Sequence, residues 1–308
     1  ARARYKLWGQ EAVKKIMLID VAEGRASLDE FMAQLTDREL AELLGGQPNT
    51  GVANTFGFGN LPEYGVPNLM TADGPAGLRI APQCGVCTTA WPCSTMLACT
   101  WNRGLVEEVG AAAAREVKEN NISFWLTPAV NIHRSPLCGR NFEYYSEDPY
   151  LTGEMASAMV TGIQSQKIGA TVKHFACNNK ETNRKNSDSR VSERAIREIY
   201  LKAFEIIVKK ADPWAIMSSY NLINGHRASE NKDLLTGILR DEWGFQGLVT
   251  TDWWTKGEHY KETLAGNDIK MGTGYPERLM EALEKGLLTR KDLEICVERV
   301  LKVFMRAE

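Results

Sequence analysis

The sequence predicts an α/β fold in which a parallel β-sheet is covered by crossover helices. From about residue 66 onward, short apolar runs alternate with longer amphipathic stretches, as in repeated strand–helix units. The length of 308 residues suits one large α/β barrel or two ordinary domains. A hydrophobic fraction of 44% is sufficient for a large buried core.

The N-terminal part has a different pattern. Residues 11–44 predict two helices joined by polar loops, with Ser27 or Asp29 as the N-cap of the second helix. Residues 45–66 are rich in Gly, Asn and Pro, so a loop is expected there.

Seven short apolar runs are predicted to be strands. A closed barrel of this type needs eight strands, and the sequence leaves open whether the eighth is short, hidden or absent. The seven runs are residues 68–73, 96–101, 124–131, 170–174, 215–220, 248–253 and 268–271.

Amphipathic helices are predicted between and after these runs. The first of them, for example, places Leu105, Val109 and Val117 near one face at helical spacing. The predicted helices are residues 103–119, 193–210, 232–242, 276–286 and 290–306.

Several predicted strands open with apolar residues and end in polar or charged ones. In parallel α/β sheets the C-terminal ends of the strands lie at one edge, where the ligand binds. A helix cap or a loop ion pair explains one such ending equally well, whereas five endings from separate strands indicate a common cavity. The endings lie at residues 71–73, 131–134, 173–174, 218–221 and 251–253.

Asp252 is the first candidate catalytic residue, because it ends a predicted strand and precedes two tryptophans. A single Asp after a strand also suits the role of N-cap for the next segment. Trp253 and Trp254 favour a sugar site, since the C–H faces of a sugar stack on aromatic rings while its hydroxyls need polar partners.

Asp73 opens a second candidate stretch, Asp73-Gly-Pro-Ala-Gly-Leu-Arg79, whose first three residues are also strong turn formers. Glycines at positions 74 and 77 allow a tight loop, which would return Arg79 to the same cavity.

Lys173 and His174 are adjacent on one predicted strand, so their side chains ordinarily face opposite sides. The alternatives are one buried His with one solvated Lys, or a bend at the strand end that lets both reach a ligand. Arg140 precedes a helix start predicted by Asp148 and Pro149, and it is the ligand candidate of its segment.

Composition disfavours several classes of function. Lys plus Arg number 37 and Asp plus Glu number 39, for a formal net charge of −2, so no basic excess indicates nucleic acid. No apolar run approaches membrane-spanning length. The N-terminus lacks a signal core and the seven cysteines are odd in number, which favours a reduced cytoplasmic protein. A mature secreted protein is the alternative.

Metal and cofactor motifs are weak. Cys84 and Cys87 form a lone pair without a second pair at zinc spacing, so a metal-binding or redox domain is a minority interpretation. The four histidines form no metal motif, and no dinucleotide or phosphate loop occurs. We therefore expect no metal and no cofactor.

Six stretches resemble glycoside hydrolase family 3, and within it the β-glucosidases. They follow the order of the family, and the resemblance covers about residues 28–306. The stretches are Met70-Thr-Ala-Asp-Gly-Pro-Ala-Gly-Leu-Arg79, Gly139-Arg-Asn-Phe-Glu-Tyr-Tyr-Ser-Glu-Asp-Pro149, Val172-Lys-His-Phe175, Val191-Ser-Glu-Arg-Ala-Ile-Arg-Glu-Ile-Tyr200, Met217-Ser-Ser-Tyr-Asn221 and Thr251-Asp-Trp253.

The resemblance implies a TIM-like (β/α)8 barrel, regular or irregular, over residues 28–308, after an N-terminal helical extension or linker at residues 1–27. It implies a retaining exo-acting β-glycosidase that cleaves terminal β-linked sugars from small oligosaccharides or aryl β-glycosides. Asp252 matches the nucleophile. The residues that match the lining of the sugar pocket are Asp73, Arg79, Arg140, Lys173, His174, Met217, Tyr220 and Trp253.

A retaining glycosidase uses two carboxyl groups about 5–5.5 Å apart. In family 3 β-glucosidases the acid/base Glu belongs to an α/β sandwich domain, which these residues do not contain. Residues 12–23 resemble the subgroup whose sandwich precedes the barrel, so we expect a longer parent protein or a partner chain. We also expect nearby Lys or Arg to hold the pKa of Asp252 low.

One subgroup of the family carries a His–Asp pair on a barrel loop instead. The corresponding loop here, Asn186-Ser-Asp-Ser-Arg190, lacks the His. Glu181, Asp188 and Glu193 lie nearby, and the sequence does not choose among them as an acid.

A different class of function is a sugar-binding barrel with little turnover, because a barrel without its acid binds a terminal sugar but cleaves it slowly. A β-xylosidase or another family 3 specificity is a further alternative. The sequence leaves open the linkage, the oligomeric state and whether phosphate replaces water as the acceptor.

Overall fold

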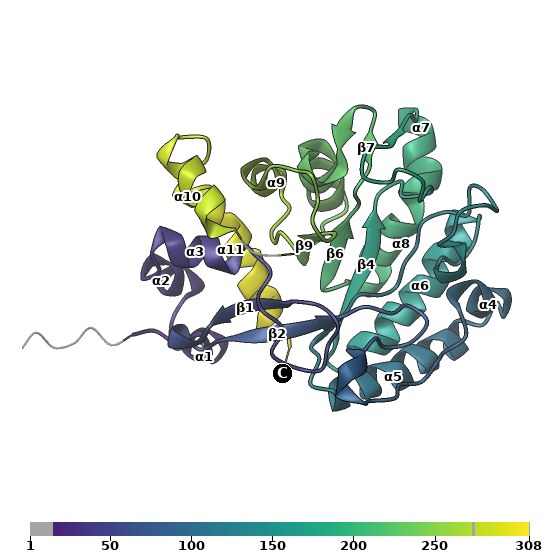
Figure 1. Ribbon diagram of the computed structural model, residues 1–308, viewed down its shortest axis with the longest axis horizontal. Helices are drawn as coiled ribbons and strands as arrows, with labels where there is room; N and C mark the ends of the chain where they lie inside the picture. Colours follow the sequence, from purple (N-terminus) through teal and green to yellow (C-terminus); the bar gives the residue numbers. More distant parts are fainter. Residues whose placement is uncertain (1–14, 273–274, 308) are drawn as a thin grey trace, which may run out of the picture.

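The computed structural model describes residues 15–272 and 275–307 (Figure 1). Its main sheet has six strands in the order β1-β2-β3-β4-β6-β9, and only the β1–β2 pair is antiparallel. The strands are β1 (Gly57–Leu61), β2 (Val66–Ala72), β3 (Phe124–Trp125), β4 (Gly169–Phe175), β6 (Ala215–Ser218) and β9 (Leu248–Thr251). The predicted α/β fold with parallel strands is therefore present, as a curled six-stranded sheet.

Isolated bridges continue the pairing beyond β9. Thr250 pairs with Ile269, and Lys270 pairs with Gly45. Gln47 in turn pairs with Gly57 of β1. The predicted strand at residues 268–271 is thus reduced to bridge pairs, because the chain makes only one residue pair with each neighbour there.

A second, small sheet lies above the main one in Figure 1. It contains β5 (Asp188–Ser189), β7 (Leu222–Ile223) and β8 (His226–Arg227). These two-residue strands connect the segment after β4 with the segment after β6, so both segments are held at the carboxyl ends of the main strands.

Three short helices open the described chain: α1 (Leu18–Ala22), α2 (Leu28–Ala33) and α3 (Asp37–Leu43). The sequence predicts two helices here; the extra break arises because Thr36 starts a capping box of its own, accepting from the Glu39 N–H. Ser27, and not Asp29, caps α2 in the same way. Residues 11–14 of the predicted first helix lie outside the described residues.

The predicted helices after residue 102 are confirmed, as is the helix start at Asp148 and Pro149, which opens α6. Helix α9 is not among the predicted helices. Between Glu193 and Ala211 the helix contains a π-helical turn, η4, and η6 is also π-helical. The helices are α4 (Ser94–Cys99), α5 (Arg103–Glu119), α6 (Pro149–Gln164), α7 (Glu193–Ala195), η4 (Ile196–Tyr200), α8 (Lys202–Ala211), η6 (Asp233–Glu242), α9 (His259–Ala265), α10 (Pro276–Glu284) and α11 (Arg290–Phe304). Single 3-10 turns are η1 (Pro62–Tyr64), η2 (Pro82–Cys84), η3 (Asn141–Glu143) and η5 (Ala228–Glu230).

The prediction of a strand at residues 96–101 is wrong, because helix α4 occupies this position. Leu97 and Ala98 are buried while Met96 and Trp101 are exposed, so only one side of the run faces the core. A run this short does not distinguish a buried strand from a helix by its apolar content.

The prediction of a loop over residues 45–66 is also wrong in part, because β1 lies within it. Its glycines are needed for close packing. A Cβ on Gly57 would lie 1.8 Å from Asn68 Oδ1, and one on Gly59 would lie 2.5 Å from the ring of Phe304 in α11. Glycine therefore indicates close approach of the strand to its neighbours here rather than a turn.

Helices α5, α6 and α8 form a row beside β4 and β6 (Figure 1). The row packs closely, since a Cβ on Gly162 of α6 would lie 2.1 Å from the Glu107 carbonyl of α5. On the other side, α3, α10 and α11 enclose a second apolar cluster around Phe31, Phe58 and Phe124. Within the described residues, no helix combines the length and apolarity needed to cross a bilayer.

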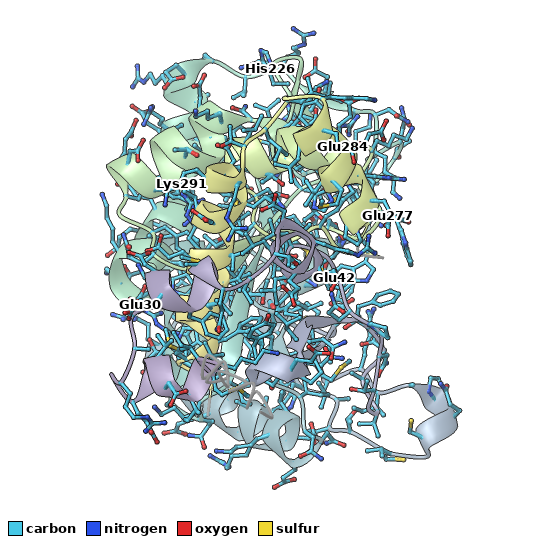
Figure 2. All side chains as sticks on the ribbon, turned by 90° about the vertical axis from the view of Figure 1, so that its left-hand side faces the viewer. Glu30, Glu42, His226, Glu277, Glu284 and Lys291 are labelled. Carbon is cyan, nitrogen blue, oxygen red and sulfur yellow. The ribbon has the colours of Figure 1, made fainter. Side chains whose placement is uncertain are left out.

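Figure 2 shows the face formed by α2, α3, α10 and α11, where Glu42 and Glu277 lie. Arg38 of α3 forms ion pairs with both, at 3.0 Å to Glu42 and 2.9 Å to Glu277. These side chains are solvated, so the two ion pairs contribute little to stability. This face is therefore held mainly by the apolar cluster beneath it.

Candidate active site

A cavity of about 520 Å³ lies at the carboxyl ends of the strands. Parallel strands bring these ends to one edge, so residues that are far apart in sequence meet there. All nine of the site residues predicted from the sequence line this cavity: Asp73, Arg79, Arg140, Lys173, His174, Met217, Tyr220, Asp252 and Trp253.

Asp252 directly follows β9 and is 9% exposed. Its backbone N–H donates to the Ser218 carbonyl of β6 at 3.1 Å, which extends the sheet to the residue itself. One carboxylate oxygen, Oδ1, accepts from the Trp253 N–H at 2.7 Å. The other, Oδ2, lies 3.9 Å from His174 Nε2. The carboxylate is thus fixed in orientation.

The pKa of Asp252 is raised above its ordinary value, which corrects the expectation that Lys and Arg would hold it low. Burial is the largest cause, because it penalises the charged form. The hydrogen bond from the Trp253 N–H and the charges of Lys173 and Arg140 lower this pKa, but they only partly offset burial. Lys173 and Arg140 each contact another carboxylate directly, so they act on Asp252 only through their charge.

Asp73 follows β2 and is held by two cations. Its Oδ1 accepts from Lys173 Nζ at 2.5 Å, and its Oδ2 accepts from Arg79 at 3.0 Å. The return of Arg79 depends on Gly74, which has a φ of 111° and would place a Cβ 1.8 Å from the Gly77 carbonyl. The tight glycine loop predicted from the sequence is confirmed.

Burial alone would raise the pKa of Asp73, but the adjacent Lys173 ammonium, the Gly74 N–H and Arg79 lower it to about 2. A carboxyl whose folded-state pKa lies below the unfolded value stabilises the fold above the unfolded pKa, and this stabilisation is lost as the pH falls through the folded pKa. The stabilisation by Asp73 is therefore present above about pH 4 and lost toward pH 2.

We expect the free energy of unfolding of the natural chain to lose about 2 kcal/mol of this contribution between pH 5 and pH 2. Asp73→Asn cannot titrate there, so the stability gap between the two proteins should narrow by that amount. Urea denaturation at both pH values measures the gap. A gap of constant size would show that Asp73 titrates normally.

Lys173 and His174 both reach the cavity although they are neighbours on β4. The pairing of β4 with β6 shifts between Lys173 and Phe175, and this irregularity provides the bend considered from the sequence. Both side chains are buried, so the alternative of one solvated Lys is wrong.

His174 is fixed by its neighbours. Asn131 accepts from the His174 backbone N–H at 3.0 Å and donates to its carbonyl at 2.9 Å. The Tyr144 hydroxyl lies 3.3 Å from His174 Nδ1. Burial, followed by the charges of Arg140, Lys173 and Arg184, lowers the pKa of His174 well below its usual value. His174 is therefore a neutral hydrogen-bonding group, and its contact with Asp252 is not a salt bridge.

Arg140 and Tyr220 complete the polar lining. The Arg140 Nε donates to Glu143, so Arg140 is already paired with a buried carboxylate. The Tyr220 hydroxyl donates to the Trp253 carbonyl at 2.6 Å. Burial and then the charge of Asp252 raise the pKa of Tyr220, which keeps the phenol protonated.

Aromatic side chains form the rim of the cavity. Trp254 is 55% exposed and meets Phe56 edge to face at 6.4 Å between ring centroids. Gly272 makes room for it, since a Cβ there would lie 2.6 Å from the Trp254 ring. Phe142 lines the same cavity and is also exposed.

Several residues that line the cavity are not among the nine predicted site residues. Glu143, Phe142 and Trp254 stood inside or beside the motifs, whereas Arg184 and residues 54–56 gave no signal because they lie in loops. The residues not assigned are Asn54, Thr55, Phe56, Leu126, Phe142, Glu143, Arg184 and Trp254.

The three carboxylates weighed as acids lie elsewhere. Asp188 pairs with Arg190 at 2.6 Å, and Glu193 pairs with Arg197 on the surface. Glu181 accepts from Arg184 at 3.0 Å and from Asn178. None of the three lines the cavity, and among the described residues the lining carboxylates are Asp73, Glu143 and Asp252.

Fold and cavity together place the chain among α/β proteins that bind ligands at the carboxyl ends of parallel strands. Residues 60–303 match the model of the "Glycosyl hydrolase family 3 N terminal domain". The chain belongs to this family, and the resemblance drawn from its motifs is confirmed.

The relatives are named as β-glucosidases. The chain is 70% identical to Beta-glucosidase A of Butyrivibrio fibrisolvens over 276 residues. The aligned region covers 90% of this chain and 33% of that protein. A β-glucosidase from Paenibacillus barengoltzii has a TM-score of 0.90 at 43% identity, over 96% of this chain and 35% of that one. β-Glucosidase 3B from Thermotoga neapolitana, in complex with α-D-glucose, has a TM-score of 0.87 at 47% identity, over 91% and 42%. The chain spans about a third of the length of its curated relatives.

Proposed function

We propose that this chain carries the nucleophile and the terminal-sugar pocket of a retaining, exo-acting β-glucosidase. The observation that carries the proposal is the Asp252 carboxylate, which faces a cavity whose other two carboxylates, Asp73 and Glu143, are already paired with cations. The relatives named β-glucosidase, and the glucose bound to the Thermotoga neapolitana enzyme, support glucose as the sugar.

In the first chemical step, an oxygen of Asp252 forms a bond to the anomeric carbon while the bond from that carbon to the leaving-group oxygen breaks. The product is a covalent glycosyl-enzyme. In the second step, water attacks the same carbon from the opposite face and displaces Asp252. Two inversions give net retention.

The other lining residues have roles that follow from their donors and acceptors. Asp73 accepts hydrogen bonds from sugar hydroxyls, while Arg140 and Lys173 donate to them. Neutral His174 both donates and accepts. Tyr220, kept protonated, has its hydroxyl beside the nucleophile. Met217 and the indole of Trp253 supply apolar surface for the ring of the sugar.

The general acid is proposed to come from a further domain, the α/β sandwich of the family, in the same parent chain or in another chain. Asp73 is a poor acid because neighbouring cations lower its pKa. Glu143 is already paired with Arg140. The greater length of the relatives is consistent with further domains. We further propose that residues 28–308 form an irregular (β/α)8 barrel, in which the segments that pair through Lys270 and Gln47 take the place of the two missing strands.

The test is a pre-steady-state assay of this chain with 2,4-dinitrophenyl β-glucoside, whose leaving group needs little acid assistance. We expect a burst of about one equivalent of dinitrophenol, followed by slow turnover. Methyl β-glucoside, with a poor leaving group, should give no burst. The matched control is Asp252→Asn, which should give no burst with either substrate.

The second candidate is a sugar-binding barrel with little turnover. It is favoured by the same pairing of Asp73 and Glu143, which leaves no described lining carboxylate free to act as an acid. Glucose binding without a burst from the dinitrophenyl glycoside would support this candidate and contradict the first.

A further inference from the structure

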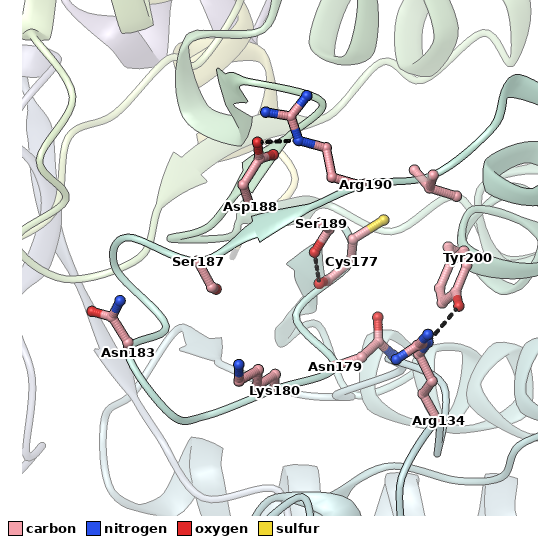
Figure 3. A pocket seen from close by; sticks show the side chains of 11 residues that line it. Arg134, Cys177, Asn179, Lys180, Asn183, Ser187, Asp188, Ser189, Arg190 and Tyr200 are labelled. Carbon is pink, nitrogen blue, oxygen red and sulfur yellow. Dashed lines mark hydrogen bonds and ion pairs between the residues drawn. The ribbon is translucent and has the colours of Figure 1, made fainter.

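A second cavity, of about 420 Å³, lies beside the segment that follows β4 (Figure 3). Residues 177–191 form much of its wall, and Arg134 and Tyr200 complete it. The same segment borders the candidate active site, because Arg184 lines that cavity while its neighbour Asn183 lines the second one. Neither the predicted nucleophile nor any of the predicted sugar-binding residues lines the second cavity.

The charge of the second cavity is positive. Arg134, Lys180 and Arg190 line it, against a single carboxylate, Asp188. Asp188 is paired with Arg190 at 2.6 Å, so this pair is neutral. Arg134 and Lys180 form no ion pair with any residue in the described ranges 15–272 and 275–307. Two positive charges therefore remain without a counter-charge, in a chain whose formal net charge is −2.

The guanidinium of Arg134, which lines the cavity, is held through one of its three nitrogens. Its Nε donates to the Tyr200 hydroxyl at 3.1 Å, and its two terminal nitrogens have no partner among the described residues. A guanidinium held in this way presents a fork of N–H donors that matches an oxyanion. Figure 3 shows Lys180 and Asn179 on the same side of the cavity as Arg134.

The remaining wall is that of a small-molecule site. The ring of Tyr200 and the side chain of Val191 are apolar, whereas Asn183 and Ser187 are polar. The volume exceeds the needs of a bare ion and lies within the range of pockets for small organic ligands. Cationic donors, amide groups and an aromatic ring together suit a sugar that bears a phosphate.

We propose that this cavity binds a phosphorylated small molecule, such as a sugar phosphate, through Arg134 and Lys180. The ligand occupies one side of residues 177–191, while the other side holds the rim of the active site. Lys185 of this segment donates to the Trp254 carbonyl at 3.3 Å, and Asn186 accepts from Lys256 at 2.6 Å. Ligand binding therefore stabilises the segment that positions the tryptophan rim.

The test is isothermal titration of the protein with glucose 6-phosphate, inorganic phosphate and glucose, at constant ionic strength. We expect saturable binding of both phosphates, tighter for glucose 6-phosphate. Lys180→Gln and Arg134→Gln should each weaken phosphate binding at least about tenfold, since each removes a charge-assisted hydrogen bond. Lys118→Gln, at an exposed lysine in the last turn of α5 that does not line the cavity, is the matched control and should leave the affinity unchanged.

Two results would overturn the proposal. Phosphate affinity unchanged in both Lys180→Gln and Arg134→Gln would place the anion elsewhere, for example against the cations of the active-site cavity. Absence of saturable binding by either phosphate up to about 10 mM would show that the cavity holds no such ligand. Because the side chains of Lys180 and Arg134 are exposed, both variants are expected to fold. An unchanged midpoint of thermal unfolding verifies this.

Discussion

Asp252→Asn is expected to lower the rate of glycosyl-enzyme formation by at least about 10,000-fold while the fold is retained. The amide keeps the shape of the carboxylate and its hydrogen bond from the Trp253 N–H, but it cannot attack the anomeric carbon. Intact-mass analysis with 2,4-dinitrophenyl 2-deoxy-2-fluoro-β-glucoside measures the effect. The natural chain should gain one fluoroglucosyl group and the variant none.

The stability of Asp252→Asn, relative to that of the natural chain, is also expected to depend on pH. A carboxyl whose folded-state pKa is raised favours folding below the unfolded pKa, and this advantage is lost as the pH rises through the folded pKa. Burial raises the pKa of Asp252, so the ionised side chain weakens the fold at neutral pH. Asp252→Asn should therefore be at least as stable as the natural chain at pH 7, and the difference should shrink below about pH 4.

The labelling experiment has a sharp contrary outcome. If peptide mapping finds the fluoroglucosyl group on Asp73 or Glu143, Asp252 is not the nucleophile. If Asp252→Asn unfolds because the Asn cannot replace the carboxylate hydrogen bonds, Asp252→Ala incubated with 2,4-dinitrophenyl β-glucoside and formate provides a second route. Formate restores a carboxylate at the vacated position, and its attack would give a glycosyl formate.

The sequence predicts which residues meet at this cavity because parallel strands obey a strong geometric rule. Asp73, Lys173 and Asp252 lie far apart along the chain, yet each lies at or just beyond the carboxyl end of a strand that pairs in parallel with at least one neighbour. The rule brings such ends together whatever lies between them. Arg79 and Arg140 were found because glycines and a helix start fixed the geometry of their loops.

The rule does not predict features that depend on the three-dimensional surroundings of a residue. The glycines at positions 57 and 59 suggest a loop, but both residues lie in β1. They are glycine because Asn68 and Phe304 approach the strand too closely for any side chain. The pKa of Asp252 was predicted in the wrong direction because charge pairs are visible in a sequence and burial is not. Depth of burial is a tertiary property, and at this position it outweighs the cations.

A buried ion pair that the sequence does not indicate contacts the segment that follows Asp252. Lys270 Nζ donates to Glu262 Oε2 at 2.5 Å, and the two side chains are 2% and 0% exposed. Glu262 Oε1 accepts from the hydroxyls of Thr255 and Ser229, both at 2.7 Å. Lys270 also donates to Thr255 and to the Gly257 carbonyl. The network therefore anchors the segment that begins at Asp252.

Lys270→Met is expected to lower the free energy of unfolding by about 3–5 kcal/mol, because it leaves the Glu262 carboxylate buried without a counter-charge. The double variant Glu262→Gln, Lys270→Met should lose less, since the glutamine is neutral and still accepts from the two hydroxyls. Lys285→Met is the matched control: its partner Glu281 is exposed, so the free energy of unfolding should stay close to that of the natural chain. Chemical denaturation of all three variants gives the comparison.

The order of the three unfolding free energies shows how the Lys270–Glu262 pair stabilises the fold. A single variant that is less stable than the double variant shows that the uncompensated charge, and not the lost hydrogen bonds, dominates the cost. Equal losses would mean that Lys270 acts mainly through Thr255 and Gly257, whose positions set the loop after Asp252. In that case the burst rate with dinitrophenyl β-glucoside should fall in both variants alike, because the loop carrying Trp253 and Trp254 would lose its anchor even though the charge is balanced.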